Sequence, residues 1–103
     1  YPPYTRMIAL EIVCENEMQG QNAIGKLRQS LSRLVSREKS VELIGPSKAA
    51  LYRIQNKFRW HLLLRSGNMK QLQNILLKCP EFNEPKAFGK IKLSIDVDPL
   101  NLL

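Results

Sequence analysis

The chain has 103 residues, of which 44% are hydrophobic and 24% charged, as is typical of one folded globular domain spanning residues 1–103. Its 16 Lys and Arg against 9 Asp and Glu leave a net charge of +7, which favours a polyanionic partner such as nucleic acid or an acidic protein tail. No apolar run approaches the roughly 18 residues that cross a bilayer, and no signal peptide is visible. We therefore expect a cytoplasmic protein with no membrane partner.

The first predicted element is a strand over residues 6–14, where apolar side chains alternate. Its inward set comprises Ile8, Leu10, Ile12 and Cys14. A polar stretch over residues 15–21 leads into a helix predicted over residues 22–36. The apolar stripe of this helix comprises Ile24, Leu27, Leu31, Leu34 and Val35. Gly25 inside the helix either costs about 1 kcal/mol relative to Ala or permits a close approach to the sheet.

A short second strand is predicted over residues 41–44 and ends at Gly45-Pro46. Residues 47–52 follow as a linker of mixed helical and loop character. A third strand is predicted over residues 58–65, with two differently composed faces. One face comprises Phe58, Trp60, Leu62 and Leu64, and the other comprises Lys57, Arg59, His61, Leu63 and Arg65.

Asn68 is the predicted N-cap of a second helix. The apolar stripe of this helix comprises Met69, Leu72, Ile75, Leu76 and Cys79, and Pro80 and Pro85 end it. The last strand is predicted over residues 90–97. Its inward set comprises Ile91, Leu93, Ile95 and Val97, and its outward set comprises Lys92, Ser94, Asp96 and Asp98.

The order β-α-β-β-α-β predicts an α+β, ferredoxin-like (split βαβ) domain. We expect a four-stranded antiparallel sheet with two helices on one face and the other face open. The predicted core comprises Ile8, Leu10, Ile24, Leu27, Leu31, Leu62, Leu72, Ile75, Ile91 and Leu93.

No catalytic constellation is recognisable in the chain. It has neither a GxxxxGK[ST] loop nor a GxGxxG motif, and His61 is its single histidine, so we expect no catalytic residue and no ATP hydrolysis. Asp96 and Asp98 are too few to hold a hard cation, and their simpler interpretation is a strand end followed by a turn. Cys14 and Cys79 are far apart, which favours reduced thiols and predicts neither a zinc site nor a disulfide.

The most informative feature is a basic segment over residues 41–65, which holds five basic residues and one acidic residue. Cations on an open sheet and its entering loop would meet phosphate oxygens, although a solvated basic face is an equal alternative. The predicted nucleic-acid contacts are Lys48, Arg53, Lys57, Arg59 and Arg65, with Tyr52 in the loop as a stacking residue. Phe58 and Trp60 have the opposite parity to Lys57 and Arg59, so we expect them in the core.

Residues 45–64, GPSKAALYRIQNKFRWHLLL, resemble the C-terminal domain of the primosomal protein N′ family, the bacterial replication-restart helicases called PriA. In that family a Gly-Pro-x-x-Ala stretch leads to a basic aromatic strand and a Leu-Leu-Leu run. Tyr1-Pro2-Pro3-Tyr4 resembles the Tyr-Pro-Pro-Phe that opens the family's last domain, and Asp96-Val97-Asp98-Pro99 resembles the family's Asp-Val-Asp-Pro. The chain departs from the family at Ala50, where Pro is common, and at Lys57-Phe58, where Gly-Arg-Tyr or Arg-Trp is frequent.

The resemblance implies the C-terminal domain of a longer ATP-dependent helicase that unwinds DNA 3′ to 5′ at stalled forks and begins reloading of the replicative helicase. It implies that the parent uses ATP and zinc through regions absent from this chain, which itself takes no cofactor. The implied partners are branched or forked DNA, the single-stranded-DNA-binding protein with its acidic tail, and the helicase core of the same polypeptide.

Three functions compete on this basis. The first is a DNA-binding accessory domain that helps to recognise branched DNA. The second is a protein-interaction domain that docks on the helicase core or on the acidic tail. The third is a free-standing RNA-binding or ribosomal-type protein, for which Lys57-Phe58-Arg59-Trp60 lacks the glycines of the RNP signature.

Overall fold

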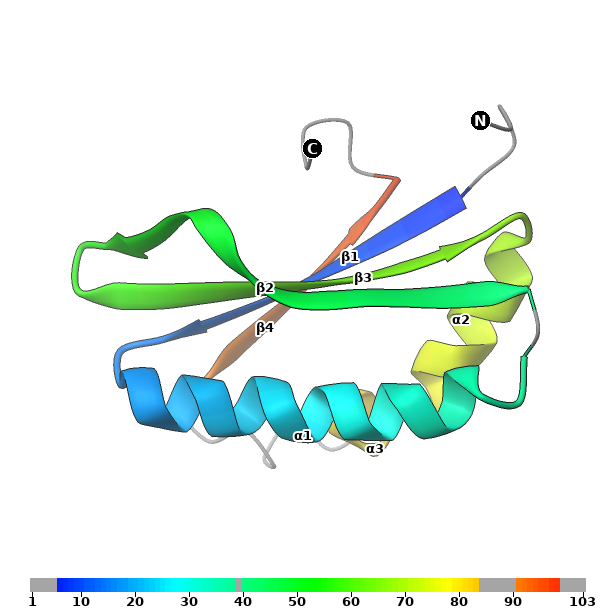
Figure 1. Ribbon diagram of the computed structural model, residues 1–103, viewed down its shortest axis with the longest axis horizontal. Helices are drawn as coiled ribbons and strands as arrows, with labels where there is room; N and C mark the ends of the chain where they lie inside the picture. Colours follow the sequence, from blue (N-terminus) through cyan, green and yellow to red (C-terminus); the bar gives the residue numbers. More distant parts are fainter. Residues whose placement is uncertain (1–5, 39, 84–90, 99–103) are drawn as a thin grey trace.

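The computed structural model describes residues 6–38, 40–83 and 91–98. The strands are β1 (Arg6–Cys14), β2 (Val41–Ile54), β3 (Lys57–Ser66) and β4 (Lys92–Val97). The helices are α1 (Glu17–Val35), α2 (Met69–Lys78) and the short α3 (Pro80–Asn83). All the strand pairs are antiparallel, in the order β2-β3-β1-β4 (Figure 1). This is the predicted ferredoxin-like arrangement.

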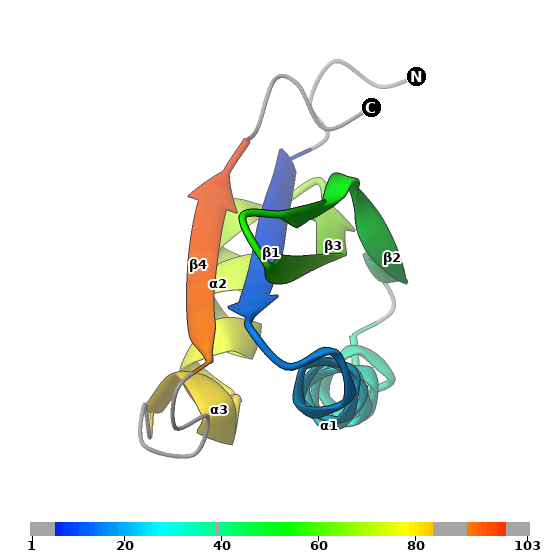
Figure 2. The same cartoon turned by 90° about the vertical axis from the view of Figure 1, so that its left-hand side faces the viewer.

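The two faces of the sheet differ because the strands alternate as the sequence predicts. On β1 and β3 the even-numbered side chains point toward α1 and α2, which pack on the same face (Figure 2). Eight of the ten predicted core residues are buried, and Leu10, Leu27, Leu31, Leu62 and Leu72 are all at 0% exposure. Ile91 and Leu93 are half-buried at the margin of this core.

Helix α1 begins at Glu17, five residues before the predicted start. The Asn16 side chain accepts a hydrogen bond from the Gln19 backbone N–H at 2.9 Å, which satisfies one of the free donors of the first turn. The apolar stripe begins only at Ala23 and Ile24, so apolar spacing alone predicts a start that is too late for this capped polar turn.

The close approach between helix and sheet occurs at Gly20 rather than Gly25. A Cβ at Gly20 would lie 2.1 Å from Cζ3 of Trp60, whereas one at Gly25 would meet nothing within 4 Å. Trp60 on β3 therefore packs directly against the backbone of α1.

Residues 47–52 are not a linker, because β2 continues through them to Ile54. The register between β2 and β3 shifts twice, first between Ile44 and Ser47 and again between Lys48 and Arg53. The first shift accommodates Gly45, with φ 103°, and Pro46, which lacks a backbone donor. Both are tolerated because β2 is an edge strand.

The second helix agrees with its prediction at both ends. Helix α2 starts after the predicted cap, with Asn68 accepting from Lys70 N at 2.9 Å, and it ends at Lys78, before Pro80. Pro80 then begins the short α3, which the sequence does not predict, and Pro85 lies outside the described residues.

Ile95 and Val97 pair with buried residues of β1 and share their face, yet they are 48% and 52% exposed. The reason is that β4 is the edge strand that the helices leave uncovered: α1 packs over β2, β3 and β1, and α2 packs over β3 and β1.

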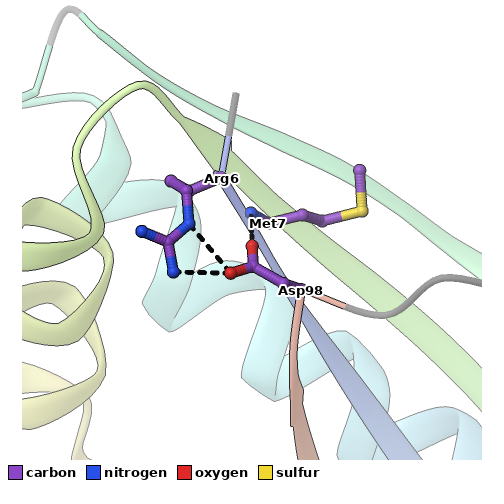
Figure 3. Close-up of polar contacts among 3 residues, drawn as sticks. All are labelled: Arg6, Met7 and Asp98. Atoms are coloured by element: carbon purple, nitrogen blue, oxygen red, sulfur yellow. Dashed lines mark hydrogen bonds and ion pairs between the residues drawn. The ribbon is translucent and has the colours of Figure 1, made fainter. Parts of the chain in front are cut away.

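Asp98 links the end of β4 to the start of β1 (Figure 3). One carboxylate oxygen accepts from Arg6 at 2.5 and 2.8 Å, and the other accepts from the Met7 backbone N–H at 3.0 Å. These bonds lower the pKa of Asp98 below its ordinary value, the Arg6 bond most. Within the described residues, no group of three or more His, Cys, Asp or Glu could hold a metal ion, and no helix is long and apolar enough to span a membrane.

Candidate nucleic-acid interface

The β2–β3 hairpin projects beyond the rest of the sheet. Pairing of β3 with β1 ends at Phe58 and Cys14, and β2 and β3 continue past it to a turn at Gln55 and Asn56. Both turn residues have positive φ, 51° and 63°, as tight hairpins require. We call residues 48–59 the arm; its tip is the leftmost part of Figure 1.

Three aromatic rings cluster on the helix side of the arm. The Tyr52 ring centroid lies 5.3 Å from that of Phe58 and 5.3 Å from that of Trp60. The Tyr52 hydroxyl donates a hydrogen bond to the Glu17 carboxylate at the start of α1. Partial desolvation, followed by this bond, raises the pKa of Tyr52 to about 12. The cluster therefore fastens the arm to α1.

Two of the basic residues that the sequence predicts as nucleic-acid contacts lie over this aromatic cluster. The Lys48 ammonium lies 4.7 Å from the Tyr52 ring centroid, and the Arg53 guanidinium lies 5.5 Å from that of Phe58. Both distances are within the range of cation–π attraction. In register, Lys48 is opposite Trp60 and Arg53 is opposite Phe58, so both cations lie toward the helix side. Both side chains are exposed.

Lys57 and Arg59 extend from the other side of the arm, on the open face of the sheet. Their parity on β3 is opposite to that of the buried Trp60, as the sequence predicts. Arg59 pairs with Val13 on β1, and Val13 pairs with Lys92 on β4. Arg59 and Lys92 therefore lie on either side of Val13. Neither they nor Lys57 form an ion pair with any residue that the structure describes.

The Arg59 side chain has an unsatisfied donor. Its Nε atom is buried and has no hydrogen-bond partner among the described residues. A buried donor left without a partner costs free energy, and an incoming acceptor such as a phosphate oxygen would relieve that cost if the side chain turned outward.

The predicted site residues thus do not form one surface. Lys57 and Arg59 lie on the open face, whereas Lys48, Arg53 and Tyr52 lie toward the helix side. Tyr52 is in strand β2 rather than in a loop, and its ring and hydroxyl are already engaged. The prediction for Tyr52 was wrong because a linker of mixed helical and loop character gives no direction for its side chains, whereas a strand does.

Arg65 is at the opposite end of the open face and is already paired. Its guanidinium donates to Glu42 on β2 at 2.7 Å. An anionic ligand would have to compete with that carboxylate. Arg65 is thus separated from the arm and less available than Lys57 or Arg59.

The sequence reasoning did not assign Lys92 to the site. Its outward parity on the last strand was predicted, but its alignment beside Arg59 depends on both β1 pairings. No signal along the chain gives that register.

A shallow hollow of about 280 Å³ occupies the middle of the open face. Its lining comprises Ala9, Glu11, His61, Ser94 and Asp96. His61 Nε2 lies 2.8 Å from a Glu11 carboxylate oxygen, so the ring is held by a neighbour across the β1–β3 pair. The open face is therefore basic near the arm and mixed in charge beyond it.

Both cysteines are free and buried. The Cys79 thiol lies 3.3 Å from a Glu81 carboxylate oxygen. Burial, and then this contact, raises the pKa of Cys79 to about 12, so the group is a neutral thiol at physiological pH.

Comparisons with known proteins agree with the resemblance in the sequence. The family model described as "Primosomal protein N C-terminal domain" matches residues 1–100. The chain is 31% identical to the replication restart protein PriA of Synechocystis, over 99% of this chain and 12% of the relative. It is also 31% identical to the replication restart protein PriA of Helicobacter pylori, over 99% of this chain and 15% of the relative. The chain thus spans a small part of these curated relatives.

Solved structures resemble the chain in fold alone. The de novo designed protein Foldit4 superposes with a TM-score of 0.67 at 11% identity, over 92% of this chain and 97% of that one. A C-terminal segment of the alpha subunit of aIF2 from Pyrococcus abyssi superposes with a TM-score of 0.53 at 16% identity, over 94% of this chain and 52% of that one.

Proposed function

Because the chain belongs to the primosomal protein N C-terminal domain family, we propose that it is a DNA-binding accessory domain of a replication-restart helicase. In this role it helps the longer protein to hold branched DNA at a stalled fork. Unwinding, ATP hydrolysis and zinc binding are assigned to the remainder of the parent, since this chain corresponds to 12% and 15% of the two relatives compared.

The observation that supports DNA binding is the charge of the arm. Lys48, Arg53, Lys57 and Arg59 lie within residues 48–59, and no acidic residue occurs in that range. Lys92 adds a further cation beside Arg59. Positive side chains that form no ion pair with the described residues are suited to phosphate oxygens, and such contacts fix position without reading sequence.

Titration of the chain with forked and duplex DNA at two salt concentrations tests the proposal. Each phosphate contact contributes a slope of about −0.9 in log affinity against log salt on duplex DNA. Changing Lys57, Arg59 and Lys92 to Gln should weaken binding and flatten the slope by up to about three contacts' worth.

The control carries Lys26→Gln with Arg33→Gln on the exposed side of α1, and it removes two charges where the site variant removes three. Arg28 is unsuitable as a control, because its Nε donates to the Gly45 carbonyl at 3.1 Å and so supports β2. Equal losses per charge removed in the two variants would show that net charge alone governs binding, and the assigned site would be wrong.

A second candidate is docking on the helicase core of the same polypeptide. Ile95 and Val97 on the edge strand β4 favour it, because two adjacent apolar side chains are about half exposed there. Changing both to Thr should weaken association with a separately expressed helicase core and leave DNA binding unchanged. The acidic tail of the single-stranded-DNA-binding protein would instead compete with DNA for the arm.

A further inference from the structure

We infer that the arm binds duplex DNA by entering the major groove, with cations on its two faces contacting phosphates on the two walls. The inference rests on the proposed DNA-binding function and specifies its ligand: a B-form duplex segment, rather than a single strand or an RNA duplex. The tip of the arm would face the base edges.

The cations are divided between the two faces of the arm. Lys48 and Arg53 extend from one face of the arm, and Lys57 and Arg59 from the other. A ligand lying flat on the open face of the sheet would reach only the second pair. A groove has a phosphate backbone along each side, so a ribbon inside it can use both pairs.

The dimensions of the arm match those of the major groove. Neighbouring strands lie about 4.8 Å apart, and a two-stranded β-ribbon fits a major groove about 12 Å wide and 8.5 Å deep. The minor groove, about 6 Å wide, is too narrow. Residues 54–57 overhang the end of the β1–β3 pairing, so at about 3.3 Å per residue the tip extends roughly 7 Å beyond it, which is close to the depth of the groove. The major groove of A-form RNA is deep and narrow and would exclude it.

The base of the arm is attached to helix α1. Trp60 packs on Gly20, and the Tyr52 hydroxyl bonds to Glu17, so the base of the arm is held before DNA arrives. Preorganisation lowers the conformational entropy lost on binding. Gln55 and Asn56 form the exposed tip, and their side-chain amides can hydrogen-bond base edges in the groove.

The test compares two face variants of the 103-residue chain, Lys48→Gln with Arg53→Gln and Lys57→Gln with Arg59→Gln. Insertion predicts that each variant flattens the salt slope on a 20-base-pair DNA duplex by up to about two contacts' worth, near 1.8. The Lys26→Gln with Arg33→Gln variant should leave the slope almost unchanged. Thermal unfolding of every variant identifies any loss that arises from misfolding.

Two probes separate insertion from flat binding. An RNA duplex of equal length and charge should bind at least about tenfold more weakly than the DNA duplex, because its major groove does not admit the arm. Guanine N7, which faces the major groove, should be protected from methylation by dimethyl sulfate within the bound site, and the Gln55→Gly with Asn56→Gly variant should reduce that protection.

The failure of the inference differs from the failure of the proposed function. Sensitivity confined to Lys57 and Arg59, equal binding of the RNA duplex, or unprotected guanine N7 would overturn insertion while DNA binding by the chain stands. If neither face variant alters binding, the insertion and the assigned residues are overturned while DNA binding stands, and if the chain binds no DNA, the proposed function is overturned as well.

Discussion

The Asp98 carboxylate links two strand ends that are far apart in sequence, the end of β4 and the start of β1. Arg6 and the Met7 backbone N–H both bond to it, where β4 ends beside the start of β1. The aspartate pair that ends the predicted strand is therefore divided, with Asp98 fastening the sheet and Asp96 exposed beside the hollow. The simpler of the two sequence interpretations, a strand end, holds for Asp98.

The bonds of Asp98 to Arg6 and Met7 predict that the free energy of unfolding depends on pH. Folding lowers the pKa of Asp98, so its contribution is fully present above the unfolded value of about 3.9 and is lost as the pH falls through the lower folded value. The Asp98→Asn variant should be less stable than the parent chain at pH 6, and the difference should shrink in strong acid. Urea unfolding at several pH values measures it, with Asp96→Asn as the control that should change little.

Two glycines of the same helix predict opposite responses to alanine. Gly20→Ala places a Cβ 2.1 Å from Trp60, and the resulting overpacking of about 1–3 kcal/mol exceeds the gain of about 1 kcal/mol in helix propensity. Gly25→Ala meets nothing within 4 Å and should stabilise the chain by about 0.5–1 kcal/mol. Denaturant unfolding checks both signs, and a Gly20→Ala chain at least as stable as the parent would contradict the Trp60 contact.

At the scale of elements, the edge strands account for most departures from the predicted pattern. Central strands β1 and β3 alternate regularly, because one face of each is covered by helices. Strand β2 accommodates Gly45, Pro46 and two register shifts at the edge of the sheet. Strand β4 leaves Ile95 and Val97 about half exposed at the other edge. Alternation alone does not reveal which strand is an edge.

The arm is also a property of paired elements rather than of one strand. Its length depends on where β1 stops pairing with β3, at Cys14 and Phe58. Lys48 and Arg53 have opposite parity along β2, so in a regular strand they would point to opposite faces. They lie toward the same face because the register shifts between them. The attachment of the arm depends on the contact between Tyr52 and the first turn of α1.

At the scale of the whole molecule, one continuous core joins both helices to the sheet. Leu31 of α1 is fully buried, and it belongs to a cluster that also contains side chains from the strands and from α2. Loss of any large side chain from this core leaves a cavity that its neighbours fill only in part. The stability of each element therefore depends on the others.

Leu31→Ala should lower the free energy of unfolding by about 2–5 kcal/mol. Met18→Ala on the same helix is the control, because Met18 is 72% exposed and its loss should change stability by less than about 0.5 kcal/mol. Chemical denaturation monitored by Trp60 fluorescence gives both values. A Leu31→Ala chain as stable as the parent would be incompatible with this core.

The sequence by itself determined the order of elements, the facing of β1 and β3, and most of the core, since each depends on a local period of apolar residues. It also placed Lys57 and Arg59 on the open face. Only the tertiary structure decided that Lys92 lies beside Arg59, that Lys48 and Arg53 face the other way, and that Gly20 receives Trp60. These depend on register, bulges and packing between segments far apart in the chain, whose energies no local pattern encodes.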